Sequence, residues 1–488
     1  MTKISIIGSG FSGLSAASYL AKEGYDVTIY EKHKQAGGRA RQFQAEGFVF
    51  DMGPSWYWMP DIFERFYNDF GKSSSDFYEM VRLSPSYQIF FEDDVMQIPA
   101  SLEELYELFE STEVGSAYKL KRFLKSAKYK YDVGINEFVE KPSLSLLEFL
   151  DFRIISASMK LNMFRSLSHE VRSLFKNDKL IQLLEFPVLF LGATPQRIPA
   201  LYSLMNYADL SLGTWYPMGG MHEIVKAFQS IALEVGVNIQ FDSPIDKINV
   251  ANSKVNSLSI GNQRAQTDIC VSSADYHFTE QQLLDPAVRN YTDKYWNNRV
   301  MAPSSLLFYL GVNKKVKGLL HHNLFFDEDF AEHAKEIYTT PKWPNKPLFY
   351  VCCPSKTDEN VAPDGMENVF LLMPLAPGIE DSEEMREKYY KIMLDRLEKR
   401  TNQKIKDNIC YKKSYCIDNF KEDYHAFKGN AYGLANTLSQ TAILKPQLKN
   451  KHLENMYYAG QLTVPGPGVP PSIISGRVVA NQIIKELN

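Results

Sequence analysis

Residues 3–13 read KISIIGSGFSG, so a short apolar segment runs straight into three spaced glycines. The apolar segment predicts a buried strand, and an apolar helix that ends at Gly24 follows the glycines. A second strand carries Val27 and Ile29. This order predicts that the chain opens with a strand, a helix and a second strand, with the glycines at the first turn.

The three glycines, Gly8, Gly10 and Gly13, have the GxGxxG spacing that binds the pyrophosphate of dinucleotides. A side chain at Gly10 would stop backbone N–H groups from approaching the pyrophosphate. Glu31 ends the second strand 18 positions after Gly13, where a carboxylate can accept hydrogen bonds from a ribose. A glycine-rich turn without a ligand is the alternative, and the strand, helix and carboxylate around it argue against that alternative. The motif alone does not separate NAD from FAD.

The composition indicates a globular protein of several lobes. Its 488 residues exceed one ordinary core, and 44% apolar with 23% charged residues is a globular composition. A formal net charge of -4 gives no general reason to expect nucleic acid as a partner. Five cysteines without a CxxC pair suit a reducing cytoplasm. Because neither a signal peptide nor a run of about 18 apolar residues is present, we expect any membrane role to be peripheral.

The pattern changes several times after the first unit. Ser101 and Glu104 form a capping-box signature, and helical patterning dominates from there to about residue 206. Residues 215–220 read as a loop, and strand-like segments between 301 and 375 predict a second sheet. We therefore expect an α/β fold with three parts. They are a discontinuous Rossmann-like nucleotide-binding domain (1–75, 212–300 and 415–488), a β-sheet substrate domain (76–105 and 301–414) and a helical lobe (106–211).

Motifs near both ends resemble flavoproteins of the amine oxidase and phytoene desaturase superfamily. The stretches GGR at 37–39 and DMGP at 51–54 are similar to the extension that follows the first nucleotide-binding unit of those proteins. The stretches YYAG at 457–460 and PGPGVP at 465–470 are similar to the C-terminal flavin signature of carotenoid desaturases, with Ser475 expected to open the terminal helix. The resemblance implies FAD rather than NAD.

Two interior stretches narrow the resemblance to carotenoid desaturases. Residues 213–221, GTWYPMGGM, are similar to the YPxGG segment of phytoene desaturases, and residues 347–365, with His321-His322 before them, resemble the same family. The likeness covers nearly the whole chain and is weakest from about 105 to 180. Many relatives carry a basic residue where this chain has Met218, so a role for that charge does not carry over. Most also lack the WYW cluster at 56–58, which points to a different carotenoid substrate.

The resemblance also implies the site residues. The cofactor residues it implies are Gly8, Gly10, Phe11, Ser12, Gly13, Glu31, Lys32, Gly38, Arg39, Gly53, Pro54, Ser55, Ile245, Gly460, Gly468, Val469 and Pro470. Because a carotenoid needs an apolar tunnel, the substrate-lining candidates are Trp56, Tyr57, Trp58, Phe190, Leu191 and Tyr202, with an ordinary core position as the alternative for each. Arg153 is the family-matched catalytic candidate, with a membrane-facing cation as its alternative. We expect no metal site, because an adjacent pair such as His321-His322 is more often packing than ligation.

The expected reaction is desaturation of a carotenoid, in which FAD takes a hydride from an allylic carbon and a neighbouring proton is then lost. No cysteine follows Cys416, so the FAD is expected to be non-covalent. No second GxGxxG is present, so we expect no NAD(P)H domain and consider oxygen or a membrane quinone as the electron acceptor. The alternatives are a hydroxycarotenoid 3,4-desaturase, a carotenoid isomerase or ketolase, and a retinol saturase-like enzyme. An amine oxidase and a non-catalytic carotenoid carrier are more distant possibilities.

A carotenoid dissolved in a bilayer must reach the enzyme without crossing water, so we expect the helical lobe to contact a membrane lipid surface from the cytoplasm. Residues 153–179 carry a local charge of +4, and an apolar stripe at helical spacing is formed by Phe164, Leu167, Val171, Leu174 and Phe175. Such a helix can lie among lipid headgroups. The alternative for this pattern is a stripe that faces the protein core beside a solvated basic face.

Overall fold

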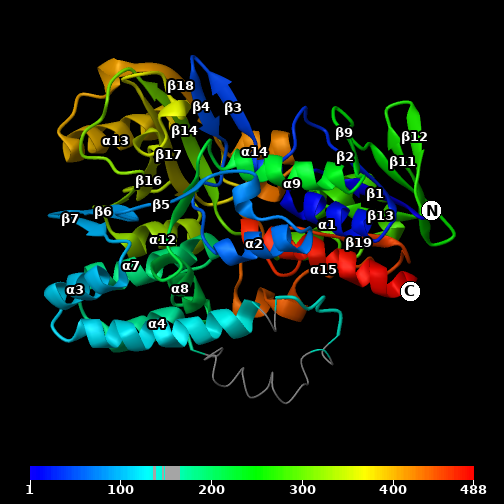
Figure 1. Ribbon diagram of the computed structural model, residues 1–488, viewed down its shortest axis with the longest axis horizontal. Helices are drawn as coiled ribbons and strands as arrows, with labels where there is room; N and C mark the ends of the chain where they lie inside the picture. Colours follow the sequence, from blue (N-terminus) through cyan, green and yellow to red (C-terminus); the bar gives the residue numbers. More distant parts are fainter. Residues whose placement is uncertain (136–138, 146–147, 149–164) are drawn as a thin grey trace.

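The computed structural model describes residues 1–135, 139–145, 148 and 165–488, and it shows a mixed α/β fold built on several sheets (Figure 1). The first sheet is parallel and draws its strands from distant parts of the chain. In spatial order its strands are β19 (Met456–Tyr458), β13 (Ile269–Ser272), β1 (Lys3–Ile7), β2 (Asp26–Tyr30) and β9 (Asn238–Gln240). The sheet therefore brings together the start, the middle and the end of the chain.

Helix α1 (Phe11–Lys22) packs against two other helices, α9 (His222–Glu234) and α15 (Val469–Leu487). Small residues allow the close contact with α15. A Cβ atom at Gly476 would lie 2.4 Å from the carbonyl oxygen of Ser12, and the hydroxyl of Ser15 donates to the carbonyl oxygen of Ile473 at 2.8 Å. The C-terminal helix is thus fixed directly on the helix that follows the glycine turn. Next to them lies α2 (Pro60–Asp69).

The second large sheet has seven strands and forms the lobe at the upper left of Figure 1. In spatial order they are β18 (Ile409–Tyr415), β14 (Ser304–Val312), β17 (Glu367–Leu375), β16 (Phe349–Cys352), β15 (His322–Phe326), β6 (Tyr87–Phe91) and β7 (Val95–Ile98). Alternate residues of β14 serve two cores: Leu306 and Phe308 pack with α13 (Glu383–Thr401), whereas Leu307 and Tyr309 join the core shared with α1. Burial on both faces explains why the strand is a continuous apolar run.

The smaller elements connect these sheets. Three strands form an antiparallel sheet, β10 (Lys247–Ala251), β11 (Lys254–Ile260) and β12 (Gln263–Gln266), and two short pairs are β3 (Gln42–Ala45) with β4 (Phe48–Asp51) and β5 (Met80–Arg82) with β8 (Trp215–Pro217). The remaining helices of this part are α10 (Tyr276–Phe278), α11 (Asp293–Asn297), α12 (Phe330–Tyr338) and α14 (Ile417–Tyr424).

The helical part lies at the lower left of Figure 1 and contains α3 (Leu102–Thr112), α4 (Ser116–Val133), α6 (Leu167–Leu174), α7 (Asp178–Glu185) and α8 (Leu204–Leu210). Helix α3 begins where the capping signature predicted, because the Ser101 hydroxyl accepts from the N–H of Glu104 at 3.4 Å. A 3₁₀ segment, Phe186–Leu191, leads from α7 toward the two sheets. None of the helices in the described part of the chain is both long enough and apolar enough to cross a bilayer.

Three expectations need correction. The apolar stripe of α6 faces the core: Leu167 and Val171 are fully buried, and the ring of Phe175 packs edge-on against that of Phe109 at 5.7 Å. Residues 215–217 form strand β8 rather than a loop, because they pair with β5. The terminal helix begins at Val469, not Ser475, since prolines are tolerated in a first turn whose N–H groups lack helical partners. Arg153 and Phe164 lie outside the described residues.

Candidate active site

The glycine turn between β1 and α1 has one packed side and one open side. A Cβ atom at Gly13 would lie 2.1 Å from the carbonyl oxygen of Gly8, so this position has no room for a side chain. At Gly10 the backbone is extended, with φ -70 and ψ 175, and the nearest atom to a Cβ would be the Ser273 hydroxyl at 4.0 Å. The protein itself leaves space at Gly10, which is the arrangement that a pyrophosphate needs.

Glu31 is buried beside this turn. One carboxylate oxygen accepts from the N–H and the hydroxyl of Ser9 at 2.8 and 2.7 Å, and the other accepts from the N–H of His33 at 2.9 Å. The segment that holds Ile245 is joined to the same strand end, because the N–H of Ser243 donates to the carbonyl oxygen of Glu31 at 2.8 Å. The structure therefore brings Glu31 and Ile245 close to the glycine turn.

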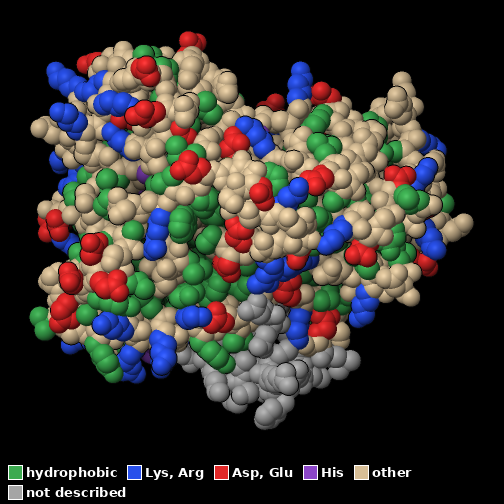
Figure 2. Space-filling model, viewed as in Figure 1, with side chains coloured by type: hydrophobic (Ala, Val, Ile, Leu, Met, Phe, Trp, Pro, Cys, Tyr) green, Lys and Arg blue, Asp and Glu red, His purple; other side chains and the backbone are tan. Residues whose placement is uncertain are grey.

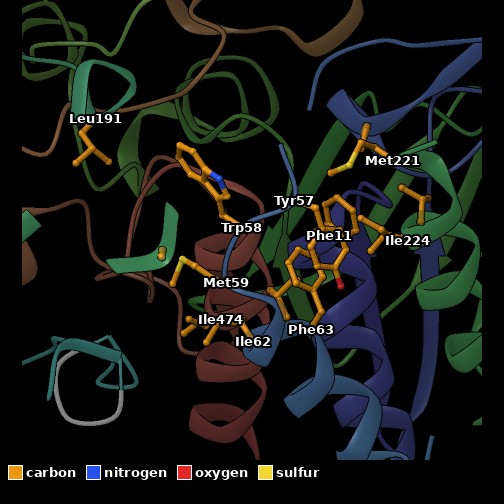
Figure 3. Close-up of a cluster of buried hydrophobic side chains, with 14 of the residues drawn as sticks. Phe11, Tyr57, Trp58, Met59, Ile62, Phe63, Leu191, Met221, Ile224 and Ile474 are labelled. Atoms are coloured by element: carbon orange, nitrogen blue, oxygen red, sulfur yellow. The ribbon is translucent and has the colours of Figure 1, made fainter. Parts of the chain in front are cut away.

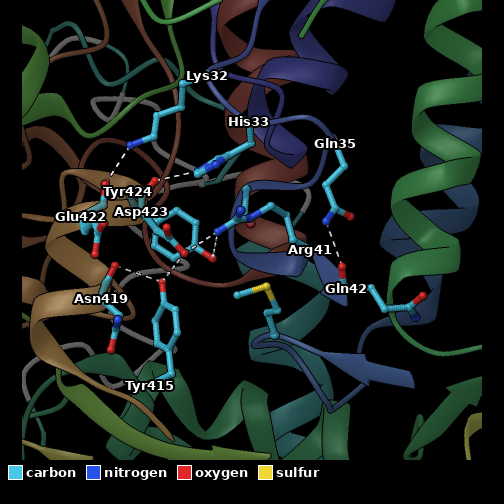
Figure 4. Close-up of polar contacts among 12 residues, drawn as sticks. Lys32, His33, Gln35, Arg41, Gln42, Tyr415, Asn419, Glu422, Asp423 and Tyr424 are labelled. Carbon is cyan, nitrogen blue, oxygen red and sulfur yellow. Dashed lines mark hydrogen bonds and ion pairs between the residues drawn. The ribbon is translucent and has the colours of Figure 1, made fainter. Parts of the chain in front are cut away.

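Lys32 points away from the turn. Its ammonium group donates to the carbonyl oxygen of Glu422 at 2.8 Å (Figure 4), so it braces α14 and does not reach the glycines. Arg41, which sequence reasoning missed, lies in the same network and forms a 2.6 Å ion pair with Asp423. Its place two residues after the GGR motif was the one signal that could have found it.

Arg39 is half-buried next to this network, and its Nε atom is inaccessible to solvent. Its guanidinium lies 4.9 Å from the centre of the Tyr424 ring and donates to the carbonyl oxygen of Asn430 at 3.3 Å. Its Nε–H has no hydrogen-bond partner among the described residues. Burial lowers the pKa of Arg39, which is an energetic cost that an anionic ligand would offset. A half-buried cation with a spare donor fits the phosphates of a dinucleotide.

Asp51 ties the DMGP and YPMGG motifs together. Its carboxylate accepts from the N–H groups of Met221 at 2.6 Å and His222 at 3.2 Å, at the start of α9. Glycines make this contact possible, since a Cβ at Gly220 would lie 2.6 Å from the same carboxylate, and a Cβ at Gly53 would lie 2.6 Å from the Arg39 carbonyl. Burial raises the pKa of Asp51 to about 6.

The C-terminal motif closes the other side of the turn. The N–H of Gly460 donates to the Ser475 hydroxyl at 2.9 Å, and the Ser12 hydroxyl contacts that of Ser273 at 2.9 Å. Gly468 has φ +115, which favours glycine, and Val469 and Pro470 follow it as the first residues of α15. Phe11 is buried and packs against the Phe228 ring, so its side chain is a core residue.

The predicted substrate-lining aromatic residues separate to two sides. Figure 3 shows Tyr57 directed toward Phe11 and Phe63, and Trp58 on the side of Leu191. The Tyr57 ring stacks on Phe63 at 4.3 Å and is buried, which favours a packing role. The Trp58 indole N–H donates to the Thr214 hydroxyl at 2.9 Å.

Trp56 lies nearest to the second sheet. Its ring stacks on that of His322 at 4.1 Å with an angle of 10° between the planes, and Tyr350 lies 5.5 Å away. Tyr202 is half-buried against the same core, whereas the side chain of Phe190 and all of Arg153 lie outside the described residues. The lining role of Trp56, Trp58, Leu191 and Tyr202 therefore stays a prediction.

A pocket opens between the cofactor motifs and the second sheet. The cofactor side contributes Gly53, Pro54, Ser55, Tyr216 and Gly220, and the sheet side contributes His321, Cys352 and Phe370. His321 precedes β15 and Cys352 ends β16, and the antiparallel pairing of these strands places His322 opposite Cys352. The pocket is thus the point where the predicted cofactor residues meet the sheet.

His321, which lines the pocket, and His322, which follows it, have the same pattern of partners. The Nδ1 of His321 lies 2.8 Å from the Thr357 hydroxyl, and the Nδ1 of His322 lies 2.6 Å from the Tyr350 hydroxyl, which donates to Ser55 at 3.1 Å. Neither Nε2 has a hydrogen-bond partner among the described residues. Burial lowers the pKa of His321 to about 3 and that of His322 well below its usual value, so both rings are neutral.

Cys352 adds a thiol to this wall. Donor atoms of His321, His322 and Cys352 lie within 4.8 Å of one another. Burial raises the pKa of the Cys352 thiol to about 12, which disfavours the thiolate form that binds metals. The chemistry of these three side chains is therefore that of a neutral wall with two imidazole nitrogens free to accept. Sequence reasoning placed the histidine pair in a family-like stretch and favoured packing or surface over metal ligation. It did not connect the pair with Cys352, because strand pairing rather than spacing joins them.

A second group of polar atoms without partners lies beside the C-terminal motif. Lys445 and Asn436 are 3% and 4% exposed, and neither the Lys445 ammonium nitrogen nor the Asn436 Oδ1 has a hydrogen-bond partner among the described residues. A Cβ on Gly466 would lie 3.1 Å from the former and 2.9 Å from the latter, so both atoms point at one place. The N–H of Asn436 donates to the Leu191 carbonyl at 2.7 Å, which joins this place to the predicted substrate lining.

Comparison with known proteins gives the following matches. The profile of flavin-containing amine oxidoreductases matches residues 11–484. The carotenoid 3,4-desaturase of Haloarcula japonica is 37% identical over 486 residues, 99% of this chain and 98% of its own. The 4,4'-diapophytoene desaturase (4,4'-diaponeurosporene-forming) of Staphylococcus aureus strain Newman is 28% identical over 498 residues, 99% of each chain.

Solved structures show the same fold at lower identity. An oxidoreductase from Methanosarcina mazei superposes with a TM-score of 0.65 at 16% identity, covering 98% of this chain and 100% of its own. Wild-type putrescine oxidase bound to putrescine superposes with a TM-score of 0.62 at 13% identity, covering 99% of each chain. These likenesses extend over both large sheets and the helical part.

Proposed function

The chain belongs to the flavin-containing amine oxidoreductases and, within them, to the carotenoid desaturases, and from this premise we propose that it is an FAD-dependent enzyme that converts a C–C bond of a carotenoid into a conjugated double bond. One structural observation carries the proposal. The pocket beside the cofactor motifs has a neutral wall of His321, Cys352 and Phe370, with the stacked Trp56 and His322 beside it. Such a wall suits an uncharged hydrocarbon.

The residues around the glycine turn fit FAD. The open side of Gly10 and the half-buried Arg39 with its spare Nε–H suit the pyrophosphate, and the buried Glu31 suits the ribose. The backbone N–H of Val469, at the start of α15, suits an anionic or carbonyl edge of the cofactor, since Pro470 and Pro471 have no N–H. When bound, FAD supplies the hydride acceptor for the reaction. The cofactor residues, and the three domain ranges given above, are part of this proposal.

The protein contributes binding, orientation and the exclusion of water. Enclosing a long polyene at about 25 cal/mol per Å² of buried apolar area supplies ample affinity without ion pairs. Trp56, Trp58 and Leu191 are the described residues that we assign to the lining. Placing one C–C bond against the cofactor inside an apolar wall favours loss of a neighbouring proton over capture of water.

A specific observation favours a carotenoid that carries a hydroxyl group. A hydrocarbon offers nothing to Lys445 and Asn436, which are costly to bury without partners. A hydroxyl can accept from the Lys445 nitrogen and donate to the Asn436 Oδ1, so one group satisfies both atoms. Because the N–H of Asn436 donates to the Leu191 carbonyl and both side chains face Gly466 next to the cofactor loop, the hydroxyl would lie close to the reacting bond. This supports a hydroxycarotenoid 3,4-desaturase.

An amine oxidase fits the pocket less well. Among the described lining residues Asp51 carries the carboxylate, and backbone N–H groups already occupy its oxygens. A carotenoid isomerase, a ketolase and a retinol saturase-like enzyme act on similar apolar substrates, and product analysis rather than pocket geometry separates them. For the electron acceptor we propose oxygen or a quinone, because the sequence holds no second GxGxxG for a nicotinamide cofactor.

Membrane contact is also part of the proposal, at a different surface from the α6 stripe. The outer face of α4 is aromatic and basic: Tyr118 is 67% exposed, Tyr129 is 41% exposed, and four cations are exposed beside them. These cations are Lys121, Arg122, Lys125 and Lys128. Figure 2 shows blue and green side chains together along the lower edge, where α4 lies in Figure 1. Tyrosines and cations suit an anionic headgroup region.

Pigment analysis tests the function. The protein is coexpressed with carotenoid precursors that differ in saturation and in hydroxylation, and the pigments are separated and analysed by mass spectrometry. We expect a red-shifted product that has lost two hydrogens per step, with the hydroxylated precursor preferred. A product of unchanged mass would instead indicate an isomerase, and a product that has gained oxygen would indicate a ketolase.

Liposome flotation tests the membrane surface. Replacing Lys121, Arg122 and Lys125 with Glu should weaken binding to anionic vesicles, because the three cations then become anions, and it should leave the FAD content unchanged. Equal flotation of the wild type and the triple variant would show that α4 is not the docking surface.

A further inference from the structure

The reaction proposed above loses a proton after the hydride, and the pocket holds one side chain placed to receive it. A proton acceptor must line the pocket, and we look for an acceptor atom that takes part in no other hydrogen bond. Among the described lining residues, Asp51 is occupied by the N–H groups of Met221 and His222, and the Cys352 thiol is protonated. His321 lines the pocket and has an Nε2 without a partner.

The surroundings of His321 keep its ring in one orientation. Nδ1 lies 2.8 Å from the Thr357 hydroxyl, and the Tyr216 ring packs against the imidazole with 4.6 Å between centres. If the Nδ1–H donates to Thr357, the lone pair is left on Nε2, inside the pocket. Asp358 is fully buried next to Thr357, and its charge favours the protonated form of His321. The carboxylate can therefore stabilise an imidazolium when one forms.

We propose that Nε2 of His321 accepts the proton that leaves the carotenoid. This inference rests on the proposed function. Bound FAD would supply the acceptor for the hydride and its two electrons, which would leave the carotenoid as a delocalised allylic cation. The C–H bond on the neighbouring carbon then breaks, its electron pair becomes the new C=C bond, and the proton forms an N–H bond at Nε2. Imidazolium beside Asp358 then releases the proton before the next turnover.

A weak base is sufficient for this step. Burial holds the pKa of His321 at about 3, so the ring is neutral and ready as an acceptor at ordinary pH. An allylic cation is a far stronger acid than any neutral hydrocarbon, so a strong base is not required to deprotonate it. His322 has a similar free nitrogen, but its ring is covered by Trp56 and it does not line the pocket.

Two variants separate chemistry from packing. His321→Asn keeps a polar atom near the position of Nδ1, where it can still meet Thr357, and removes the Nε2 position. His321→Gln instead places an amide atom near the position of Nε2. The control is His333→Gln, at a buried histidine of α12 whose ring nitrogens contact the Pro374 carbonyl at 3.1 Å and the Leu348 N–H at 2.9 Å. This control alters a histidine of the same lobe outside the pocket.

The experiment uses FAD-loaded protein, mixed without oxygen with the carotenoid that the wild type desaturates. Bleaching of flavin absorbance reports hydride removal, and mass spectrometry reports the products formed per flavin bleached. For His321→Asn we expect at least a tenfold loss of the desaturated product per flavin bleached, with an alcohol formed by capture of water on the cation. His321→Gln should recover part of the desaturated product, and His333→Gln should match the wild type.

Two results would overturn the inference. One is desaturated product from His321→Asn at the wild-type yield and rate, within threefold. The second is an ¹⁵N spectrum of the ligand-free protein that shows a protonated Nε2 on His321, a readout that does not depend on turnover or on folding of a variant. If no carotenoid bleaches the flavin of the wild-type protein, the proposed function is refuted instead. The two failures are therefore distinguishable.

Discussion

Replacing Gly10 with Val should separate cofactor binding from folding. The backbone of Gly10 is extended, with φ -70 and ψ 175, which valine adopts without strain. A Cβ there would have no neighbour closer than the Ser273 hydroxyl at 4.0 Å, so the cofactor-free protein has room for it. The added methyl groups occupy the space that the pyrophosphate needs. We therefore expect a folded protein that does not hold FAD.

The expected magnitudes follow from the same geometry. At the helix N-cap, a change from glycine to valine costs about 1 kcal/mol, so the cofactor-free Gly10→Val protein should unfold within that margin of the wild type. Blocking the pyrophosphate should weaken FAD binding at least ~1,000-fold, or about 4 kcal/mol. By contrast, Gly13→Ala should destabilise the cofactor-free protein itself, because its Cβ would lie 2.1 Å from the Gly8 carbonyl oxygen.

Denaturant unfolding with and without FAD measures both effects. In the wild type, FAD at about 100 times its Kd should add ~2.7 kcal/mol to the unfolding free energy, and Gly10→Val should lose this increment. Stoichiometric FAD with wild-type affinity in Gly10→Val would refute the assignment of the glycine turn. A cofactor-free Gly10→Val protein that is several kcal/mol less stable than the cofactor-free wild type would also refute it, because the valine would then clash with the protein's own atoms.

Four further outcomes are expected. Denaturation should release all flavin into the soluble fraction, as measured by absorbance after precipitation. Gly476→Ala should lower the unfolding free energy by about 1–3 kcal/mol in urea, because its Cβ would lie 2.4 Å from the Ser12 carbonyl oxygen. Lys130→Met should cost about 3–5 kcal/mol in the same assay, since it leaves the buried Glu170 carboxylate, now 2.7 Å from the ammonium, unpaired. Burial raises the pKa of Asp209 to about 7, so the folded form binds more protons than the unfolded form between about pH 4 and 7. The free energy of unfolding should therefore fall as the pH rises through this range. Asp209→Asn should flatten that dependence, as measured by urea titrations across the same range.

The first unit of the fold could be predicted because its causes are local. The strand Lys3–Ile7, the glycine turn and the helix Phe11–Lys22 follow from apolar spacing and from backbone conformations that glycine permits. The cap at Ser101 was predictable for the same reason, since the side chain and the N–H that it accepts are three residues apart. Local turn and cap signals are therefore sufficient to predict where these elements begin and end.

The terminal helix shows where local rules mislead. The prolines at 470 and 471 read as a loop, yet they occupy the first turn of α15, where a missing N–H costs nothing. Similarly, the α6 stripe has a pattern shared by membrane-surface and core-facing helices, and only the position of Phe109 against Phe175 decides between them. Such outcomes depend on tertiary neighbours that the local pattern does not contain.

The candidate site was predictable where it follows motifs and not where strand pairing builds it. Gly10 and Glu31 lie together because they belong to one short unit. His321 and Cys352 come together only through the pairing of β15 with β16, which brings residues about thirty positions apart side by side. A role for Lys445 could not be predicted from the sequence, because an isolated lysine is usually solvated. Only its burial without a partner among the described residues identifies it as a candidate.

The most direct test of the central claim is a single-turnover reaction of the purified, FAD-loaded protein with a defined carotenoid in lipid vesicles. Flavin absorbance, the carotenoid spectrum and the product mass are recorded from the same sample. We predict loss of flavin absorbance together with a red-shifted carotenoid that is two hydrogens lighter, in one-to-one proportion. Unchanged carotenoid, with flavin absorbance lost and peroxide formed only on addition of an amine, would contradict the account.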